Sequence, residues 1–130
     1  MNKFLVQANI IEKFTEKLNT AQTEAVNYME GPLIVLAGAG TGKTKVLTTR
    51  VAHIIDNNLA FPSQILCVTF TNKAAREMSE RVQKLVSQNM EKMPWMGTFH
   101  SIGAKIIRNH AEVIGLKQSF TILSNFGGVR

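Results

Sequence analysis

A glycine-rich octapeptide, set between two differently patterned segments, is the feature that most constrains this chain. Residues 37–44 read AGAGTGKT and follow a short, wholly apolar and β-rich run at residues 33–37. After the octapeptide, apolar residues recur at helical spacing as far as Asn57. A buried strand that turns through glycines into a helix lets backbone N–H groups and the helix N-terminus surround a phosphate. The segment therefore predicts a phosphate-binding loop.

Two polar residues close this loop. Lys43 supplies a mobile cation for the β and γ phosphates of a nucleotide, and the hydroxyl of Thr44 is placed to ligate Mg²⁺. The general pattern begins with glycine, whereas Ala37 holds that position here. The alternative is a glycine-rich turn with a surface lysine. Gly-Lys-Thr after a β-rich run favours binding of ATP or GTP.

The rest of the chain alternates short apolar runs with amphipathic segments. Strands are expected at residues 65–70 and around 95–97, and a helix follows each of them. The first of these helices, which Asn72 can cap, has the apolar stripe Ala75, Met78, Val82, Leu85 and Val86. The second ends at Gly115 and has the stripe Ile102, Ile106, Ile107, His110, Val113 and Ile114. The alternation predicts an α/β fold, a parallel sheet with helices on both faces.

Three further helices are expected around the loop. Helical spacing runs through residues 1–18, on Phe4, Ala8, Ile11, Phe14 and Leu18. A second helix extends from Thr20 to about Met29, where Asn19 can cap its start and Gly31-Pro32 ends it. The helix after the loop carries Val46, Leu47, Val51, Ile54 and Ile55 on one face.

Composition limits the classes of protein that remain. A chain of 130 residues suits one domain, and its net charge of +6 favours a polyanionic partner such as nucleic acid. Cys67 is the only cysteine, so an internal disulfide is impossible and a small buried apolar role is expected. No apolar run reaches the roughly 18 to 20 residues that span a membrane. We expect a cytoplasmic protein without membrane contact.

Four motifs, in order and spacing, resemble those of UvrD/Rep-like superfamily 1 DNA helicases. They are LNTAQ at 18–22, AGAGTGKT at 37–44, VTFTNKAAREM at 68–78 and GTFHS at 97–101, and they look like the Q motif and motifs I, Ia and Ib. The resemblance implies a partial RecA-like P-loop domain that uses ATP and Mg²⁺. An unrelated P-loop enzyme is the alternative, and the joint occurrence of the four motifs argues against it.

The resemblance implies a set of ATP-binding residues. Gln22 would pair with the adenine edge, since an amide both donates and accepts; taken alone, it would be read as an exposed helical residue. Lys45 stands where the family commonly has arginine, and it keeps the positive charge but lacks the planar guanidinium group that can stack. The ATP-binding set is Gln22, Ala37, Gly38, Ala39, Gly40, Thr41, Gly42, Lys43, Thr44 and Lys45, with Thr44 also the Mg²⁺ ligand.

Motifs Ia and Ib imply contacts to single-stranded DNA. The matching residues are Thr69, Phe70, Thr71, Asn72, Lys73, Thr98, Phe99 and His100. A base can stack on Phe70, but plain core packing is an equally good reading of that residue. His100 can be a structural histidine, and Asn72 can act as a cap. Arg76, Arg81, Lys84 and Lys105 are most simply a solvated face whose charge assists nucleic-acid binding.

The resemblance divides the chain into a helical extension (1–17), a partial UvrD-like ATP-binding domain (18–123) and a divergent tail (124–130). The acidic pair of motif II, which holds Mg²⁺ and activates water, is absent, so no catalytic residue is assigned. We expect a truncated or frameshifted part of a 3′-to-5′ helicase that does not unwind DNA alone, and a downstream helicase fragment is a candidate partner. The alternative is a non-catalytic nucleotide- and strand-binding module or a decayed gene product.

Overall fold

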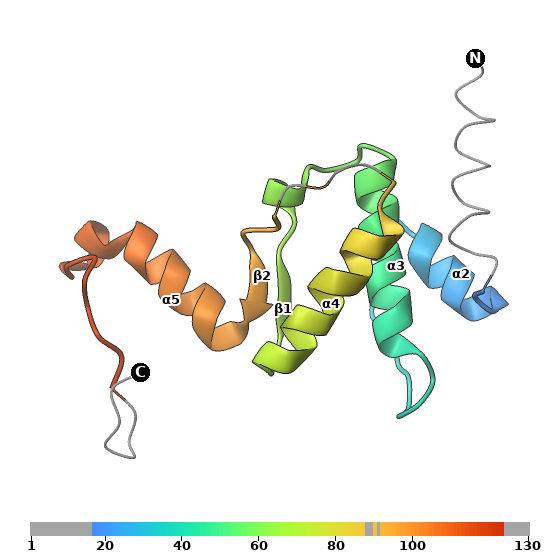
Figure 1. Cartoon of the computed structure of the whole chain (residues 1–130), viewed down its shortest axis with the longest axis horizontal. Coiled ribbons are helices and arrows are strands. Elements are labelled where there is room, and N and C mark those ends of the chain that lie inside the picture. Colours follow the sequence, from blue (N-terminus) through green and yellow to red (C-terminus); the bar gives the residue numbers. More distant parts are fainter. Residues whose placement is uncertain (1–16, 88–89, 91, 124–130) are drawn as a thin grey trace.

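A computed structural model describes residues 17–87, 90 and 92–123. The expected N-terminal helix, except for its last two residues, and the tail at 124–130 lie outside the described residues. The elements, in chain order, are α2 (Thr20–Asn27), α3 (Lys43–Asp56), η1 (Pro62–Gln64), β1 (Cys67–Thr69), α4 (Asn72–Leu85), β2 (Met96–Thr98), α5 (Phe99–Asn109) and η2 (Ala111–Ile114), where η marks a 3₁₀ turn (Figure 1).

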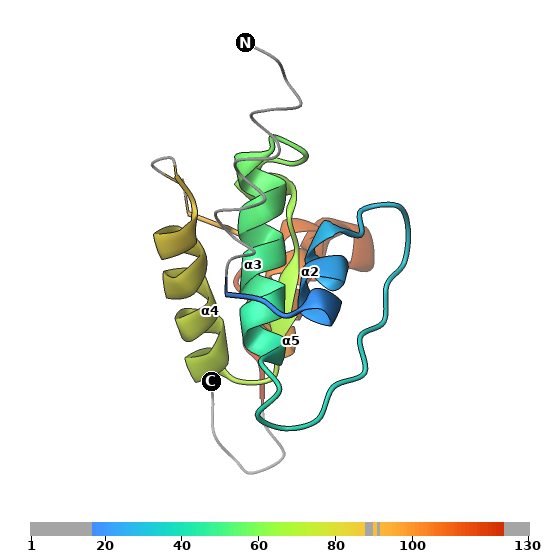
Figure 2. The ribbon, with the colours of Figure 1, turned by 90° about the vertical axis from the view of Figure 1, so that its right-hand side faces the viewer.

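Strands β1 and β2 form a two-stranded parallel sheet. Cys67 lies opposite Met96, and Thr69 lies opposite Thr98 at the carboxyl ends of the strands. Figures 1 and 2 show α3 and α4 on one face of this sheet and α5 on the other. The alternating pattern of the sequence thus predicts the parallel pairing and the two covered faces correctly. The sheet is smaller than expected, because a third strand does not form.

The buried strand predicted at residues 33–37 is wrong for this structure. The run is unpaired, and its side chains reach solvent: Ile34 is 85% exposed and Leu36 is 93% exposed. A strand of this composition needs neighbours for its hydrogen bonds and helices over its faces. Within the described residues, β1 and β2 pair only with each other. Figure 2 shows the segment between α2 and α3 as an open curve beside the helices.

The main core lies where α3 and α4 meet the sheet. It comprises Val51, Ala52, Ile55, Cys67, Met78, Val82, Val86 and Met93. Helix α4 begins at Asn72 after its N-cap Thr71, rather than being capped by Asn72, because the Thr71 side chain accepts a hydrogen bond from the Ala74 N–H at 3.1 Å. Its apolar stripe faces the core as predicted. Burial raises the pKa of the Cys67 thiol, which suits an inert apolar residue.

Polar contacts fix the far end of α3. Asp56 accepts hydrogen bonds from the N–H of Ser87 at 3.1 Å and from its hydroxyl at 3.0 Å, which ties α3 to the end of α4. Asn57 Nδ2 lies 3.0 Å from Nδ1 of the buried His53. Desolvation by burial, with Arg50 adding to it and Asp56 opposing it, lowers the pKa of His53 and so favours the neutral ring.

A second, smaller cluster joins α2 to the start of α3. It consists of Ala25, Val26 and Val46, with Leu18 packed against it. Asn19 caps α2 as predicted, and Arg50 Nη1 donates to the carbonyl oxygens of Ala25, at 2.6 Å, and of Tyr28. Because α3 lies between α2 and α4, it buries more than the single face expected, while Leu47 stays exposed.

The predicted stripe of α5 is covered only at its start. Ile102 is buried, and the helix ends at Asn109, earlier than expected. Turn η2 follows and ends at Gly115, whose φ of 72° supports the predicted stop. The other members of the stripe are exposed: Ile106, Ile107, His110, Val113 and Ile114. Among the described helices, none is both long and apolar enough to cross a membrane.

Candidate nucleotide site and nucleic-acid interface

The glycine-rich loop leads directly into α3. Gly40 and Gly42 have φ values of 73° and 82°, the left-handed region that glycine adopts without steric cost. The Thr41 hydroxyl donates to the Gly38 carbonyl at 2.6 Å, which tightens the turn. Gly42 is the N-cap of α3 and offers no side-chain acceptor, so the first N–H groups of the helix stay available to an anion.

Gln22 connects α2 to this loop. Its Oε1 accepts from the Asn19 N–H at 3.0 Å and completes a capping box, while its Nε2 donates to the Thr41 carbonyl at 3.0 Å. An amide has two donor hydrogens and two acceptor lone pairs, so one of each remains for an adenine edge. The proposed base contact stays a prediction. The link between α2 and the loop is a role that the motif alone did not indicate.

A pocket of about 290 Å³ opens between α2, the loop and α3. It brings together five predicted ATP-binding residues: Gln22, Ala37, Gly38, Thr41 and Lys43. Gly40, Gly42 and Thr44 lie beside it on the loop and on the first turn of α3, and Ala39 lies on the loop. Lys45 points elsewhere, since its Nζ donates to the Lys17 carbonyl. A cation, glycine-rich backbone and a helix N-terminus therefore converge on one hollow, as phosphate binding requires.

Thr44 fits the role of a single Mg²⁺ ligand. It is exposed, and its hydroxyl makes no hydrogen bond to any described residue. In the part of the chain that the structure describes, no cluster of three or more His, Cys, Asp or Glu could hold a metal ion. A Mg²⁺ at this position would therefore depend on the phosphates of its nucleotide and on water for most of its ligands.

The predicted DNA-binding residues meet at the carboxyl ends of the two strands. Thr69 is buried there, and its hydroxyl donates to the Thr71 carbonyl at 2.9 Å. Thr71 caps α4, and Thr98 caps α5 by accepting from the Ser101 N–H at 3.1 Å. Ser101 also bonds back to Thr98, a contact that the motif alone did not assign. Two helix N-termini thus lie side by side, where backbone N–H groups can hold phosphates.

Two phenylalanine rings stand above these strand ends. Phe70 and Phe99 have ring centroids 5.3 Å apart with planes tilted by 44°. Phe70 is 90% exposed and Phe99 is 57% exposed, so Phe70 is not a core residue. An exposed pair of rings on neighbouring elements offers apolar faces on which bases can stack.

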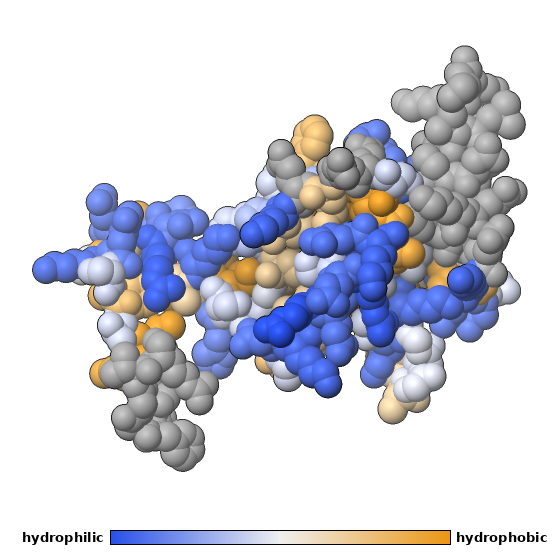
Figure 3. Space-filling view, viewed as in Figure 1, coloured by the Kyte–Doolittle hydropathy of each residue, from blue (hydrophilic) through white to orange (hydrophobic). Residues whose placement is uncertain are grey.

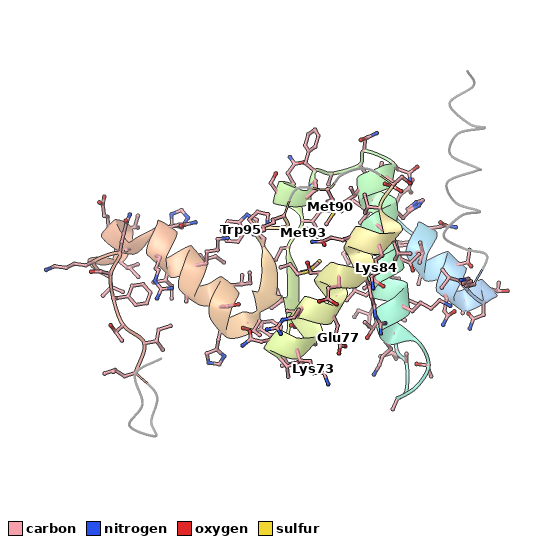
Figure 4. All side chains as sticks on the ribbon, viewed as in Figure 1. Lys73, Glu77, Lys84, Met90, Met93 and Trp95 are labelled. Carbon is pink, nitrogen blue, oxygen red and sulfur yellow. The ribbon has the colours of Figure 1, made fainter. Side chains whose placement is uncertain are left out.

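The remaining predicted residues border this pair. Asn72 and Lys73 occupy the first turn of α4, and His100 occupies the first turn of α5; all three are exposed. Figure 4 shows Lys73 at the start of α4, with Glu77 one turn further along. Hydroxyl groups, amide groups, a cation and two rings are therefore collected on one edge of the sheet.

Comparison with known proteins identifies the same family. Residues 18–126 match the family model of the UvrD/REP helicase N-terminal domain. The chain is 54% identical over 106 residues to the ATP-dependent DNA helicase PcrA of Staphylococcus aureus strain Mu50, which covers 82% of this chain and 14% of the relative. It is 49% identical over 113 residues to PcrA of Leuconostoc citreum, with 87% of this chain and 15% of the relative covered.

DNA helicase II of Rickettsia typhi is 54% identical over 116 residues, which cover 88% of this chain and 17% of the relative. The chain thus spans only 14% to 17% of the length of these curated relatives. The family-model match covers far more than half of the chain and contains all four motifs. On these grounds, the chain belongs to the UvrD/REP helicase family and corresponds to part of its N-terminal domain.

Proposed function

We propose that this chain supplies the first ATP-binding and single-strand-binding motifs of an ATP-dependent DNA helicase of the 3′-to-5′ type. The proposed unit is residues 18–123, a partial RecA-like P-loop domain preceded by a helical extension at 1–17 and followed by the tail at 124–130. A cytoplasmic location agrees with this role. The names of the relatives, which are ATP-dependent DNA helicases, support ATP over GTP as the nucleotide.

The observation that carries the proposal is that the two candidate sites share one edge of the fold. The starts of α3, α4 and α5 all lie at the lower edge of the molecule in Figure 1. There the glycine-rich loop approaches α3, and the Phe70–Phe99 pair stands over the strand ends. In parallel α/β folds, ligands bind outside the carboxyl ends of the strands. A nucleotide and a DNA strand would therefore contact neighbouring elements.

Within the nucleotide site, each group has a distinct task. The Lys43 ammonium would neutralise the β and γ phosphates, and the N–H groups at the start of α3 would hold their oxygens. Mg²⁺, held in part by Thr44, would supply further charge neutralisation when bound. The Gln22 amide would keep the loop in place through Thr41 and use its remaining donor and acceptor on adenine.

Hydrolysis requires acidic groups that the described strands and helices do not place beside the loop. After β1 the chain continues with Phe70-Thr71, and after β2 with Phe99-His100, so no acidic pair follows either strand. A carboxylate that holds Mg²⁺ and positions the attacking water is thus missing from the described elements. We propose that a polypeptide of this sequence binds Mg-ATP and DNA without turnover, and that a fragment with the downstream helicase motifs would be needed for unwinding.

Titration of the full chain with Mg-ATP tests this function, with phosphate release measured in the same samples with and without oligo-dT. Saturable binding without phosphate release is expected, and Lys43→Ala should abolish the binding. Lys92→Ala, a substitution at an exposed lysine away from the loop, is the matched control and should bind ATP normally. DNA-stimulated phosphate release would contradict the missing-acid argument, and absence of binding would favour a decayed gene product.

A further inference from the structure

A second basic hollow lies between α3 and α4, apart from the glycine-rich loop. Its volume is about 350 Å³, and it is lined by Lys17, Lys45, Thr48, Thr49, Arg81, Lys84 and Leu85. We name it the α3–α4 hollow. It shares no lining residue with the pocket beside the loop. The sequence predicted Lys45 as an ATP contact and Arg81 and Lys84 as part of a solvated face, but it did not predict that these side chains line one hollow.

Every ionisable group that lines the α3–α4 hollow is a cation. Arg81 and Lys84 lie one turn apart on α4, and Lys45 is held across from them by its bond to the Lys17 carbonyl. No carboxylate belongs to the lining within the described residues, and none lies within ion-pair distance of these four cations there. Figure 4 places Lys84 on the side of α4 toward α3, and Figure 3 shows strongly hydrophilic residues over α4 in the same view.

The floor of the hollow strengthens its attraction for anions. Thr48 and Thr49 are buried, and the Thr48 hydroxyl donates to the Thr44 carbonyl at 2.9 Å, so the base of the hollow is withdrawn from water and carries no charged group. Clefts lined by one sign of charge over low-dielectric walls focus the electric field. Four cations around such a base favour a ligand with several adjacent negative charges over a single carboxylate.

We propose that the α3–α4 hollow binds backbone phosphates of a nucleic-acid strand, in addition to the edge that carries Phe70 and Phe99. This inference rests on the proposed DNA binding and extends it to a second face of the domain. The chemistry is that of the phosphodiester backbone, since the hollow has no exposed ring to stack a base among its lining residues. Binding here is therefore independent of base sequence.

The test measures how the affinity for fluorescein-labelled oligo-dT depends on salt, using the full chain. Arg81→Gln/Lys84→Gln removes two lining cations and keeps good helix formers in α4. Because each phosphate contact on a single strand contributes about 0.7 to the slope of log K against log salt, the slope should fall by roughly 1.4. Lys92→Gln/Lys117→Gln removes the same charge from exposed positions outside the hollow and should change the slope far less.

Equal slopes for the two double variants, with unchanged thermal midpoints, would overturn the proposed phosphate binding in the α3–α4 hollow. The proposed DNA binding at the edge with Phe70 and Phe99 would remain intact. Failure of the wild-type chain to bind oligo-dT would overturn both. Titration of tripolyphosphate into the Lys43→Ala variant, in which the glycine-rich loop should no longer bind phosphate, tests whether the hollow binds free polyphosphate instead of a nucleic-acid strand. If Arg81→Gln/Lys84→Gln removed tripolyphosphate binding without altering the slope for DNA, the hollow would be a site for free polyphosphate, and the nucleic-acid assignment would be wrong.

Discussion

At the scale of single residues, Gly42 combines two constraints on the nucleotide site. Its φ is 82°, and a Cβ there would lie 2.9 Å from Gln22 Nε2. Gly115 has a similar φ of 72° but nothing within 4 Å, so it is a matched control. We expect Gly115→Ala to cost about 1 kcal/mol of unfolding free energy from backbone strain alone. Gly42→Ala should lower the free energy of unfolding by more than Gly115→Ala does, as measured by urea unfolding, and should also weaken ATP binding in a nucleotide titration. Equal losses of unfolding free energy in the two variants, with normal ATP affinity, would contradict this prediction.

His53 predicts a pH dependence of stability. Burial lowers its pKa in the folded chain, and Asn57 Nδ2 donates to Nδ1, which must therefore stay unprotonated. Above about pH 6.5 both states hold the neutral ring, and as the pH falls below that value the unfolded chain binds the proton more readily. The urea midpoint should thus drop between pH 7.5 and 5.5, and His53→Gln should flatten that drop. An identical drop in the variant would assign the effect to other groups.

At the scale of elements, the base-stacking surface depends on a contact between two of them. Phe70 follows β1 and Phe99 begins α5, so neither element alone presents both rings. Phe70→Ala should weaken oligo-dT binding by about fivefold to more than a hundredfold, given that stacking is worth roughly 1 to 3 kcal/mol per base. Phe99→Ala should act on the same site, so the double variant should lose less than the sum of the single losses.

Phe61 supplies the control for this prediction. It is 69% exposed, like the other two rings, but precedes η1 at the opposite end of β1. Phe61→Ala should leave the affinity for oligo-dT unchanged in the same fluorescence titration. A comparable loss from Phe61→Ala would mean that exposed apolar area in general, rather than the paired rings, binds the strand.

At the scale of the whole molecule, the exposed apolar run at 33–37 predicts poor solubility rather than poor stability. Ile34 and Leu36 bury little surface, so Ile34→Lys/Leu36→Lys should keep the free energy of unfolding within about 0.5 kcal/mol and reduce aggregation measured by light scattering. Val82→Ala, in the fully buried core, should instead cost about 2 kcal/mol. A large loss of stability from the lysine variant would show that the run is covered in solution.

Local signals in the sequence predicted those parts of the fold that local chemistry determines. The Asn19 cap, the helix that begins at Lys43 and the stripe of α4 depend on residues within a few positions of one another, and all three are confirmed. The strand at 33–37 failed because its formation depends on partners distant in sequence.

In the candidate site, too, local features could be predicted from the sequence and contacts between distant segments could not. Spacing placed Lys43 at a helix start, but it could not show that Lys45 turns toward Lys17, that Gln22 holds Thr41, or that Phe70 meets Phe99. Those contacts join segments 19 to 29 positions apart, and a motif specifies the order of residues rather than their meeting in space.

The double hydrogen bonding of Gln22 makes α2 and the glycine-rich loop thermodynamically coupled. One amide both completes the cap of α2 and restrains Thr41. By linkage, a nucleotide that binds better to the restrained loop must also stabilise the capped α2 by the same factor. Fraying of α2 must in turn weaken nucleotide binding by that factor. Helix α2 would then act as a reporter of occupancy, with its amide hydrogens exchanging more slowly when the loop holds a phosphate.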